Sequence, residues 1–91
     1  MTASTRFPLG RVVATDNALK AVPAIQMLKA LRRHSRCDWG ELDPHDQAAN
    51  TQALQTGGRL LSVYTTEQGI RFYVLTEADR SSTTVLLPED Y

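Results

Sequence analysis

The C-terminal third of the chain alternates strand-like runs with short polar clusters. Residues 59–65, 70–76 and 83–87 are rich in β-branched, aromatic and aliphatic side chains, and turn-forming residues separate them. Short polar loops between such runs are typical of antiparallel hairpins. We therefore predict a three-stranded antiparallel sheet at this end of the chain. Residues 10–15 (GRVVAT) are another β-branched run, which we expect to be either an edge strand or an extended lead-in.

Helical patterns occupy the region between these runs. Asp16 can cap a short helix, and Pro23 favours a break with a second helix from Pro23 to about His34, a single kinked helix being the alternative. Asp43 followed by Pro44 predicts a third helix that extends to about Thr56. The predicted fold class is thus α+β: two or three N-terminal helices packed on a three-stranded antiparallel sheet, with an N-terminal edge strand as an option. We expect residues 1–9 to be a poorly held N-terminus and residues 10–91 to be one domain.

The alternation of side chains divides the predicted sheet into a core face and a second, half-exposed face. Phe72 and Val74 should lie on the core face, and we place Tyr64 and Tyr73 on the second. Aromatic side chains on a half-exposed face are typical anchors for protein partners. We expect the core to contain Ile25, Leu28, Leu31, Trp39, Leu54, Leu61, Val63, Phe72, Val74, Val85 and Leu87.

Charge is balanced over the whole chain but not along it. Ten basic and ten acidic side chains give zero net charge, yet residues 1–40 hold seven basic and two acidic ones (+5), and residues 41–91 hold three and eight (−5). Zero net charge argues against an acidic mimic of DNA and against a strongly basic nucleic-acid binder. Segregated charge still allows a local patch of either sign. Because a chain of this length has a small core, formation of a homodimer would add useful buried surface.

Four basic residues form the one patterned polar feature. Lys29, Arg32, Arg33 and Arg36 recur at spacings that gather them on one face of the predicted second helix. They can form a site for an anionic partner, or they can be a solvated face that opposes the C-terminal end of the helix dipole. Trp39 follows them, and as the lone tryptophan it is expected to anchor the core.

No catalytic or metal-binding pattern emerges from the sequence. His34, Cys37, Asp38 and His45 lie close together in the chain, but they lack the paired close ligands on both sides that structural zinc sites show. There is no Gly-x-Ser-x-Gly elbow, no Gly-x-Gly-x-x-Gly loop and no P-loop. The single cysteine cannot form an internal disulfide, and no apolar run approaches the length of a signal peptide or a membrane span. We expect a cytoplasmic protein that is not an enzyme and has no cofactor, no metal and no contact with a membrane.

Three segments carry a resemblance to a known family: residues 38–43 (DWGELD), residues 50–64 (N-x-x-A-L-x-x-G-G-R-L-L-S-x-Y) and residues 76–91 (TEADRSSTTVLLPEDY). Over roughly residues 10–91, the chain resembles small uncharacterised proteins of bacterial plasmids and prophages. Members are often labelled "plasmid-related protein" or "type I restriction endonuclease subunit M". The second label is not supported here, because the chain lacks the glycine-rich cofactor loop and the Asn/Asp-Pro-Pro-aromatic motif of such methyltransferases.

The resemblance implies an origin on a mobile element, and small proteins of such elements frequently block host defences. We therefore expect a non-enzymatic phage or plasmid accessory protein that inhibits a host defence complex, a CRISPR effector or a restriction enzyme, by steric protein binding. Its expected partner-binding residues are the four basic residues named above together with Tyr64 and Tyr73. The alternative is a small DNA-binding regulator or maintenance protein of the element that uses the basic helix face.

Overall fold

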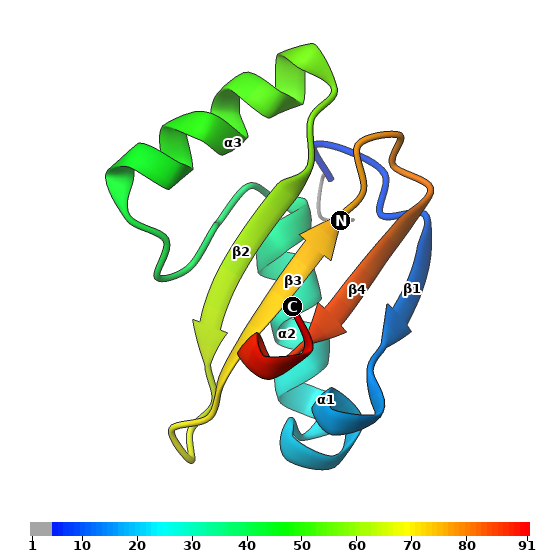
Figure 1. Ribbon diagram of the computed structural model, residues 1–91, viewed down its shortest axis with the longest axis vertical. Coiled ribbons are helices and arrows are strands. Elements are labelled where there is room, and N and C mark those ends of the chain that lie inside the picture. Colours follow the sequence, from blue (N-terminus) through cyan, green and yellow to red (C-terminus); the bar gives the residue numbers. More distant parts are fainter. Residues whose placement is uncertain (1–4) are drawn as a thin grey trace.

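The structure, a computed structural model, describes residues 5–91, which form three α-helices and one four-stranded mixed sheet (Figure 1). The predicted α+β class is confirmed. The elements are β1 (Arg11–Ala14), α1 (Asp16–Ala21), α2 (Ala24–Ser35), α3 (Pro44–Thr56), β2 (Leu60–Thr65), β3 (Arg71–Thr76), β4 (Ser82–Leu86) and a 3-10 turn, η1 (Pro88–Asp90).

The sheet has the strand order β1-β4-β3-β2. The pairs β2–β3 and β3–β4 are antiparallel, as predicted, whereas β1 joins β4 as a parallel edge strand. In Figure 1, α2 lies behind the sheet, α3 lies beside β2, and η1 lies in front of β3. One face of the sheet is therefore covered by helices, and the other carries only the C-terminal turn among the described elements.

The helix ends follow the local signals in the sequence. The chain breaks at Pro23, so that α1 and α2 are separate helices, and Asp43 caps α3 by accepting a hydrogen bond from the Asp46 amide at 2.8 Å. Gly57, with φ of 87°, closes α3 in the left-handed conformation. One cap differs from the prediction, because Thr15 and not Asp16 accepts the hydrogen bond at the N-terminus of α1.

Strand register corrects the predicted division of the sheet faces. Tyr64 pairs with Phe72 and Ser62 with Val74, so these residues share the face that α2 covers. Tyr64 is buried at 3% exposure and does not lie beside Tyr73. The error arose because the sequence shows the alternation within each strand but not which residues of two strands face each other.

The buried face of α2 also differs from the prediction. Ile25 and Leu28 were expected in the core, but they are 60% and 48% exposed. Ala30 and His34 are buried instead, with Met27 and Leu31 partly buried on the same side. Both faces of this helix carry aliphatic side chains, and the sequence alone does not show which one the sheet selects. Of the other expected core residues, Leu54 and Leu61 are half-buried, and Trp39, Val63, Phe72, Val74, Val85 and Leu87 are buried.

The N-terminal segment is held more firmly than expected from residue 6 onward. Phe7 is 6% exposed and stacks on Trp39 with ring centroids 6.2 Å apart, and the Arg6 amide donates to the Ser35 carbonyl at 2.8 Å. The expected poorly held N-terminus therefore does not extend to Phe7, and residues 1–4 lie outside the described residues.

Asn50 of α3 closes the outer edge of β2. Its side-chain amide donates to the Leu61 carbonyl at 2.7 Å and accepts from the Leu61 amide at 3.2 Å, which is how a neighbouring strand would bond. Farther along the strand, Val63 donates to the Trp39 carbonyl and accepts from the Glu41 amide. These bonds attach α3 and its preceding loop to the sheet. They also satisfy the outward backbone groups of Leu61 and Val63, which an edge strand would otherwise leave free.

Arg80 joins the β3–β4 turn to the end of α3. Its guanidinium donates to the carbonyls of Gly58 (2.6 Å) and Ala53 (3.1 Å), and also to two carbonyls of its own turn. A cation at these carbonyls opposes the negative end of the α3 dipole. The planar fork of five N–H donors lets one side chain reach both segments.

We predict that Arg80→Ala lowers the free energy of unfolding by ~2–3 kcal/mol, because several carbonyls lose a charged donor. Arg80→Lys should recover less than half of this loss, since an ammonium cannot span both segments. Urea denaturation measures both effects. The matched control is Arg59→Ala, which removes a surface ion pair with Glu77 and should cost at most ~1 kcal/mol. An equal loss of unfolding free energy in Arg80→Ala and Arg59→Ala would show that Arg80 does not join the β3–β4 turn to the end of α3.

Candidate functional site

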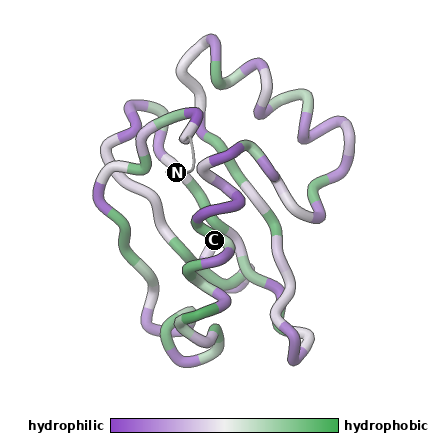
Figure 2. Tube along the Cα trace, turned by 180° about the vertical axis from the view of Figure 1, so that it is seen from behind, coloured by the Kyte–Doolittle hydropathy of each residue, from purple (hydrophilic) through white to green (hydrophobic). Residues whose placement is uncertain are grey.

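The outward side of α2 combines aliphatic and basic side chains. At about 100° per residue, five exposed residues lie opposite the buried Ala30 and His34. We call this surface the α2 outer face, and its members are Ile25, Leu28, Lys29, Arg32 and Arg36. Figure 2, which looks onto the helix side of the sheet, shows hydrophobic residues where α1 meets α2 and mostly hydrophilic ones toward the end of α2.

Three of the four predicted basic residues are free to meet a partner. Among residues 5–91, no acidic side chain lies within ion-pair distance of Lys29, Arg32 or Arg36. Arg33 is engaged within the molecule. Its guanidinium donates to both carboxylate oxygens of Asp38, at 2.8 and 3.2 Å, and its central carbon lies 4.7 Å from the centroid of the Tyr64 ring. The hydrogen-bonded ion pair raises the pKa of Arg33 and lowers that of Asp38.

The two tyrosines of the predicted site lie on opposite faces of the sheet. The Tyr64 hydroxyl donates to the Asp38 carbonyl at 2.5 Å, and burial raises the pKa of Tyr64. Tyr73 lies on the other face, with its ring edge-on to Tyr91 at a centroid distance of 5.9 Å. It lines a groove of about 370 Å³ whose charged lining residues are the acidic Glu41, Asp43 and Asp46 and the basic Arg71. The structure thus does not bring Tyr64 and Tyr73 into one surface.

Beneath α2, a chain of hydrogen bonds runs through the core. His34 bonds Ser62 through Nδ1 at 2.5 Å and Thr76 through Nε2 at 2.9 Å. Thr76 then bonds Thr83 at 2.7 Å, and the Thr83 hydroxyl donates to the Leu9 carbonyl at 2.7 Å. All four side chains are fully buried. The chain connects α2 with three strands and with the segment that precedes β1.

The Leu9 carbonyl fixes the direction of the bonds from Thr83 back to Nε2 of His34, and the neutral form of His34 fixes the bond to Ser62. Because the single hydroxyl hydrogen of Thr83 goes to Leu9, Thr76 must be the donor to Thr83. Thr76 has no second hydrogen, so Nε2 of His34 must carry a proton and donate it to Thr76. A neutral His34 then accepts from Ser62 at Nδ1. Burial, with a smaller contribution from the Arg80 cation, lowers the pKa of His34 to about 4, which favours this neutral form.

This arrangement limits the chemistry available to His34. Both ring nitrogens are bonded to hydroxyls inside the core, so neither is placed to take a proton from an external substrate or to hold a metal. Asp38, another residue of the cluster considered for zinc, is paired with Arg33. Within residues 5–91, no three His, Cys, Asp or Glu side chains gather closely enough to hold a metal ion.

Sequence reasoning found the basic residues of the α2 outer face but missed its aliphatic members, Ile25 and Leu28. It also treated His34 as a residue near the helix end, whereas the histidine is the polar centre of the core. Hydroxyl residues at the inward positions of the predicted strands were the available signal, because a buried imidazole needs such partners.

The buried His34 predicts a loss of stability in mildly acidic solution. The unfolded chain binds a proton on this histidine below pH 6.5, whereas the folded chain binds it only near pH 4. The free energy of unfolding should therefore fall as pH drops from 6.5 to 4, by up to about 3 kcal/mol. Urea denaturation at several pH values measures this slope.

The control for this prediction is the exposed His45, since His45→Gln should leave the slope unchanged, whereas His34→Gln should remove it. The free energy of unfolding is compared only above pH 4. Asp38 and Asp90, whose pKa values are lowered in the folded chain, take up protons below pH 4. A free energy of unfolding that is constant between pH 6.5 and 4 would show that His34 is not buried in its neutral form.

Within residues 5–91, no helix is both long enough and apolar enough to cross a membrane. Comparisons with protein-family models, with curated proteins and with solved structures found no match to this chain.

Proposed function

We propose that this domain is a non-enzymatic protein-binding module that docks through the α2 outer face on an acidic surface of its partner. The observation that supports this proposal most directly is that cations and exposed aliphatic side chains share one side of α2. Ile25 is 60% and Leu28 48% exposed, next to Lys29, Arg32 and Arg36, which have no acidic partner among residues 5–91. Exposed large aliphatic residues beside charges are typical of protein interfaces.

The proposed partner is a host defence complex, a CRISPR effector or a restriction enzyme, and the proposed effect is a steric block in the cytoplasm. The support is the resemblance of residues 38–43, 50–64 and 76–91 to proteins of mobile elements, together with the charge distribution. Charge complementarity speeds and orients docking, and aliphatic contacts then slow dissociation. Zero net charge favours a specific block over general mimicry of DNA.

A second candidate function is a DNA-binding regulator or maintenance protein of the element. The basic spacing on α2 favours it, because cations at successive turns of an exposed helix can follow a phosphate backbone. Against it stand Ile25 and Leu28, since aliphatic side chains exposed at the N-terminal end of such a stripe gain nothing from phosphates. The two functions differ in their salt dependence, which is steep for DNA.

We predict that the tagged protein captures a subunit of a CRISPR or restriction complex from its native host, as identified by mass spectrometry. The double variant Arg32→Gln/Arg36→Gln should reduce capture at least tenfold, because it removes two free charges from the α2 outer face. The matched control Arg11→Gln/Arg71→Gln removes the same charge from exposed strand positions and should capture normally. Leu28→Ser should also reduce capture of the partner, although it removes no charge.

An electrophoretic mobility shift assay with plain duplex DNA at moderate salt tests the DNA-binding alternative. A shift that is lost in the Arg32→Gln/Arg36→Gln variant, combined with recovery of element DNA and no protein partner, would replace the proposed function by the DNA-binding one. Capture that is equal in all variants would place the partner-binding surface elsewhere on the domain.

A further inference from the structure

The sheet has an open edge along β1. The amides of Arg11 and Thr15 donate to carbonyls on the β4 side, each at 3.0 Å. Because successive residues of a strand direct their backbone groups to alternate sides, the amides and carbonyls of Val12 and Ala14 point away from β4. β1 ends the strand order, so no described strand lies on that side. In Figure 1, β1 runs along the margin of the molecule, and α1 and α2 lie inward of it.

The side chains along this edge are apolar and accessible. Val12 is 45% and Val13 38% exposed, and they lie on opposite faces of the sheet because they are neighbours in the strand. Natural edge strands are often protected from pairing by lysine, by proline or by a covering helix. β1 contains neither lysine nor proline, and its only charge is Arg11 at its first position. We call the outward side of Val12, Val13 and Ala14 the β1 edge.

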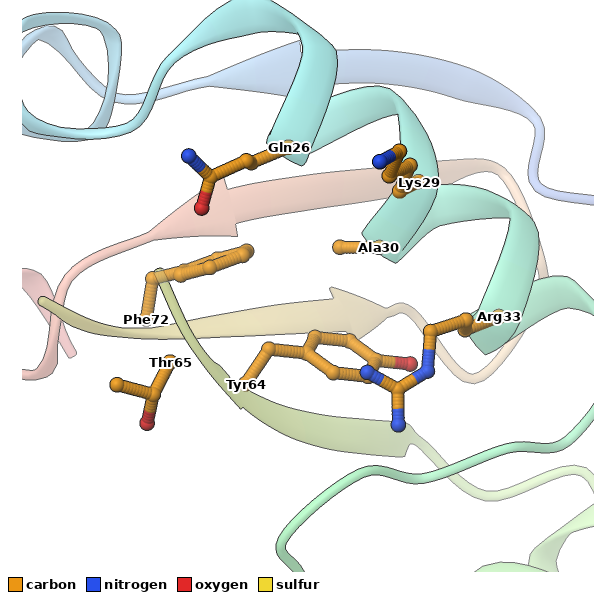
Figure 3. A pocket seen from close by; sticks show the side chains of 7 residues that line it. All are labelled: Gln26, Lys29, Ala30, Arg33, Tyr64, Thr65 and Phe72. Carbon is orange, nitrogen blue, oxygen red and sulfur yellow. The ribbon is translucent and has the colours of Figure 1, made fainter. Parts of the chain in front are cut away.

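The hollow between α2 and the β2–β3 hairpin offers no comparable surface. Its floor consists of Ala30, Tyr64 and Phe72, which are only 2–3% exposed. The Arg33 guanidinium already lies over the Tyr64 ring (Figure 3). The β1 edge, by contrast, combines outward backbone groups with exposed side chains.

One antiparallel register uses every outward backbone group of the β1 edge. If Val13 faces Val13 of a second copy, Val12 lies opposite Ala14 of that copy, and Ala14 lies opposite its Val12. Each of these two pairs exchanges hydrogen bonds in both directions, because all the residues involved point outward. The Val13 pair makes no backbone bond, and in such pairs the side chains approach most closely. The edge is therefore complementary to itself.

The charges at the two ends of β1 fit the same register. Arg11 begins β1, Asp16 begins α1 shortly after β1 ends, and both residues are exposed. In the antiparallel register, Arg11 of each copy lies opposite Thr15 of the other and next to its Asp16. Opposite charges therefore meet at both ends, whereas parallel strands would place Arg11 beside Arg11. Among residues 5–91, no acidic side chain lies within ion-pair distance of Arg11.

From these observations we propose that the β1 edge binds a second copy of this chain in a two-fold symmetric dimer. The sheet then continues from one copy into the other. Because β1 has four residues, the interface is small, and we expect a dissociation constant of roughly 0.1 mM. The α2 outer face takes no part in this pairing, so the dimer does not depend on the proposed function.

The experiment is sedimentation equilibrium of the full chain with exchanged charges. Arg11→Glu and Asp16→Lys should each weaken self-association at least about tenfold, because each places like charges at both ends of the paired strands. An equimolar mixture of the two variants should associate as strongly as the original chain, since the mixed pair has opposite charges at both ends. A variant that failed to fold could not restore association in this way. The matched control Arg71→Glu makes the same change on an exposed position of β3 and should associate normally.

NMR of the backbone amides locates the contact. As the protein concentration rises, the signals of Val12 and Ala14 should shift and their hydrogen exchange should slow. The Val13 amide points toward β4 and should change less. Val13→Lys should abolish self-association, because it places two ammonium groups opposite each other across the two-fold axis.

The proposal is overturned if the chain stays monomeric up to about 1 mM, well above the expected dissociation constant. It is also overturned if the mixed charge variants do not associate or if the shifts lie away from β1. A monomeric chain that loses its captured partner on Val13→Lys would instead assign the β1 edge to a strand of that partner. Failure of capture through the α2 outer face would leave the dimer unaffected.

Discussion

The architecture of this domain depends on keeping one neutral histidine in the core. His34 comes from α2, and its two ring nitrogens bond hydroxyls of β2 and β3, with the chain of bonds continuing through β4 to the Leu9 carbonyl. Each group has a single arrangement that satisfies the next, so a rotation or shift of α2 would leave several buried polar atoms unpaired. The rings of Phe7 and Trp39 pack edge-on against the same imidazole, at centroid distances of 5.3 and 5.6 Å. The position of α2 on the sheet, and with it the direction of its basic residues, follows from this constraint.

Because the histidine faces inward, the charges of α2 face outward, and the fold turns the +5/−5 asymmetry of the sequence into two chemically different sides. The helix side presents cations with aliphatic residues, whereas the open face of the sheet holds a groove lined by three carboxylates (Glu41, Asp43 and Asp46) and one cation (Arg71). Tyr91 lines both this groove and a second hollow near Leu75 and Leu86, and its ring packs edge-on against Tyr73. The two sides can meet partners of opposite charge without competing for the same residues.

Local signals in the sequence predicted much of the fold and less of the site. Proline, glycine and capping residues act within a few positions, so the break at Pro23 and both ends of α3 were correctly predicted. The antiparallel hairpins were predicted by alternation. The side of Tyr64, by contrast, depends on pairing between strands, and the burial of His34 in place of Ile25 depends on hydroxyls 28 and 42 residues away.

The amide of Asn50 has a consequence for how copies of this protein can meet. A sheet grows into a ribbon only when it offers two open edges, one for each neighbour. Here β2 is closed by Asn50 and by the Trp39–Glu41 backbone, while β1, at the other edge, pairs only with β4 among residues 5–91. Two copies that joined through β1 would form one continuous sheet with a closed edge at each end. Edge-to-edge pairing through β1 therefore stops at two molecules, because Asn50 and the Trp39–Glu41 backbone together occupy the other edge of each copy.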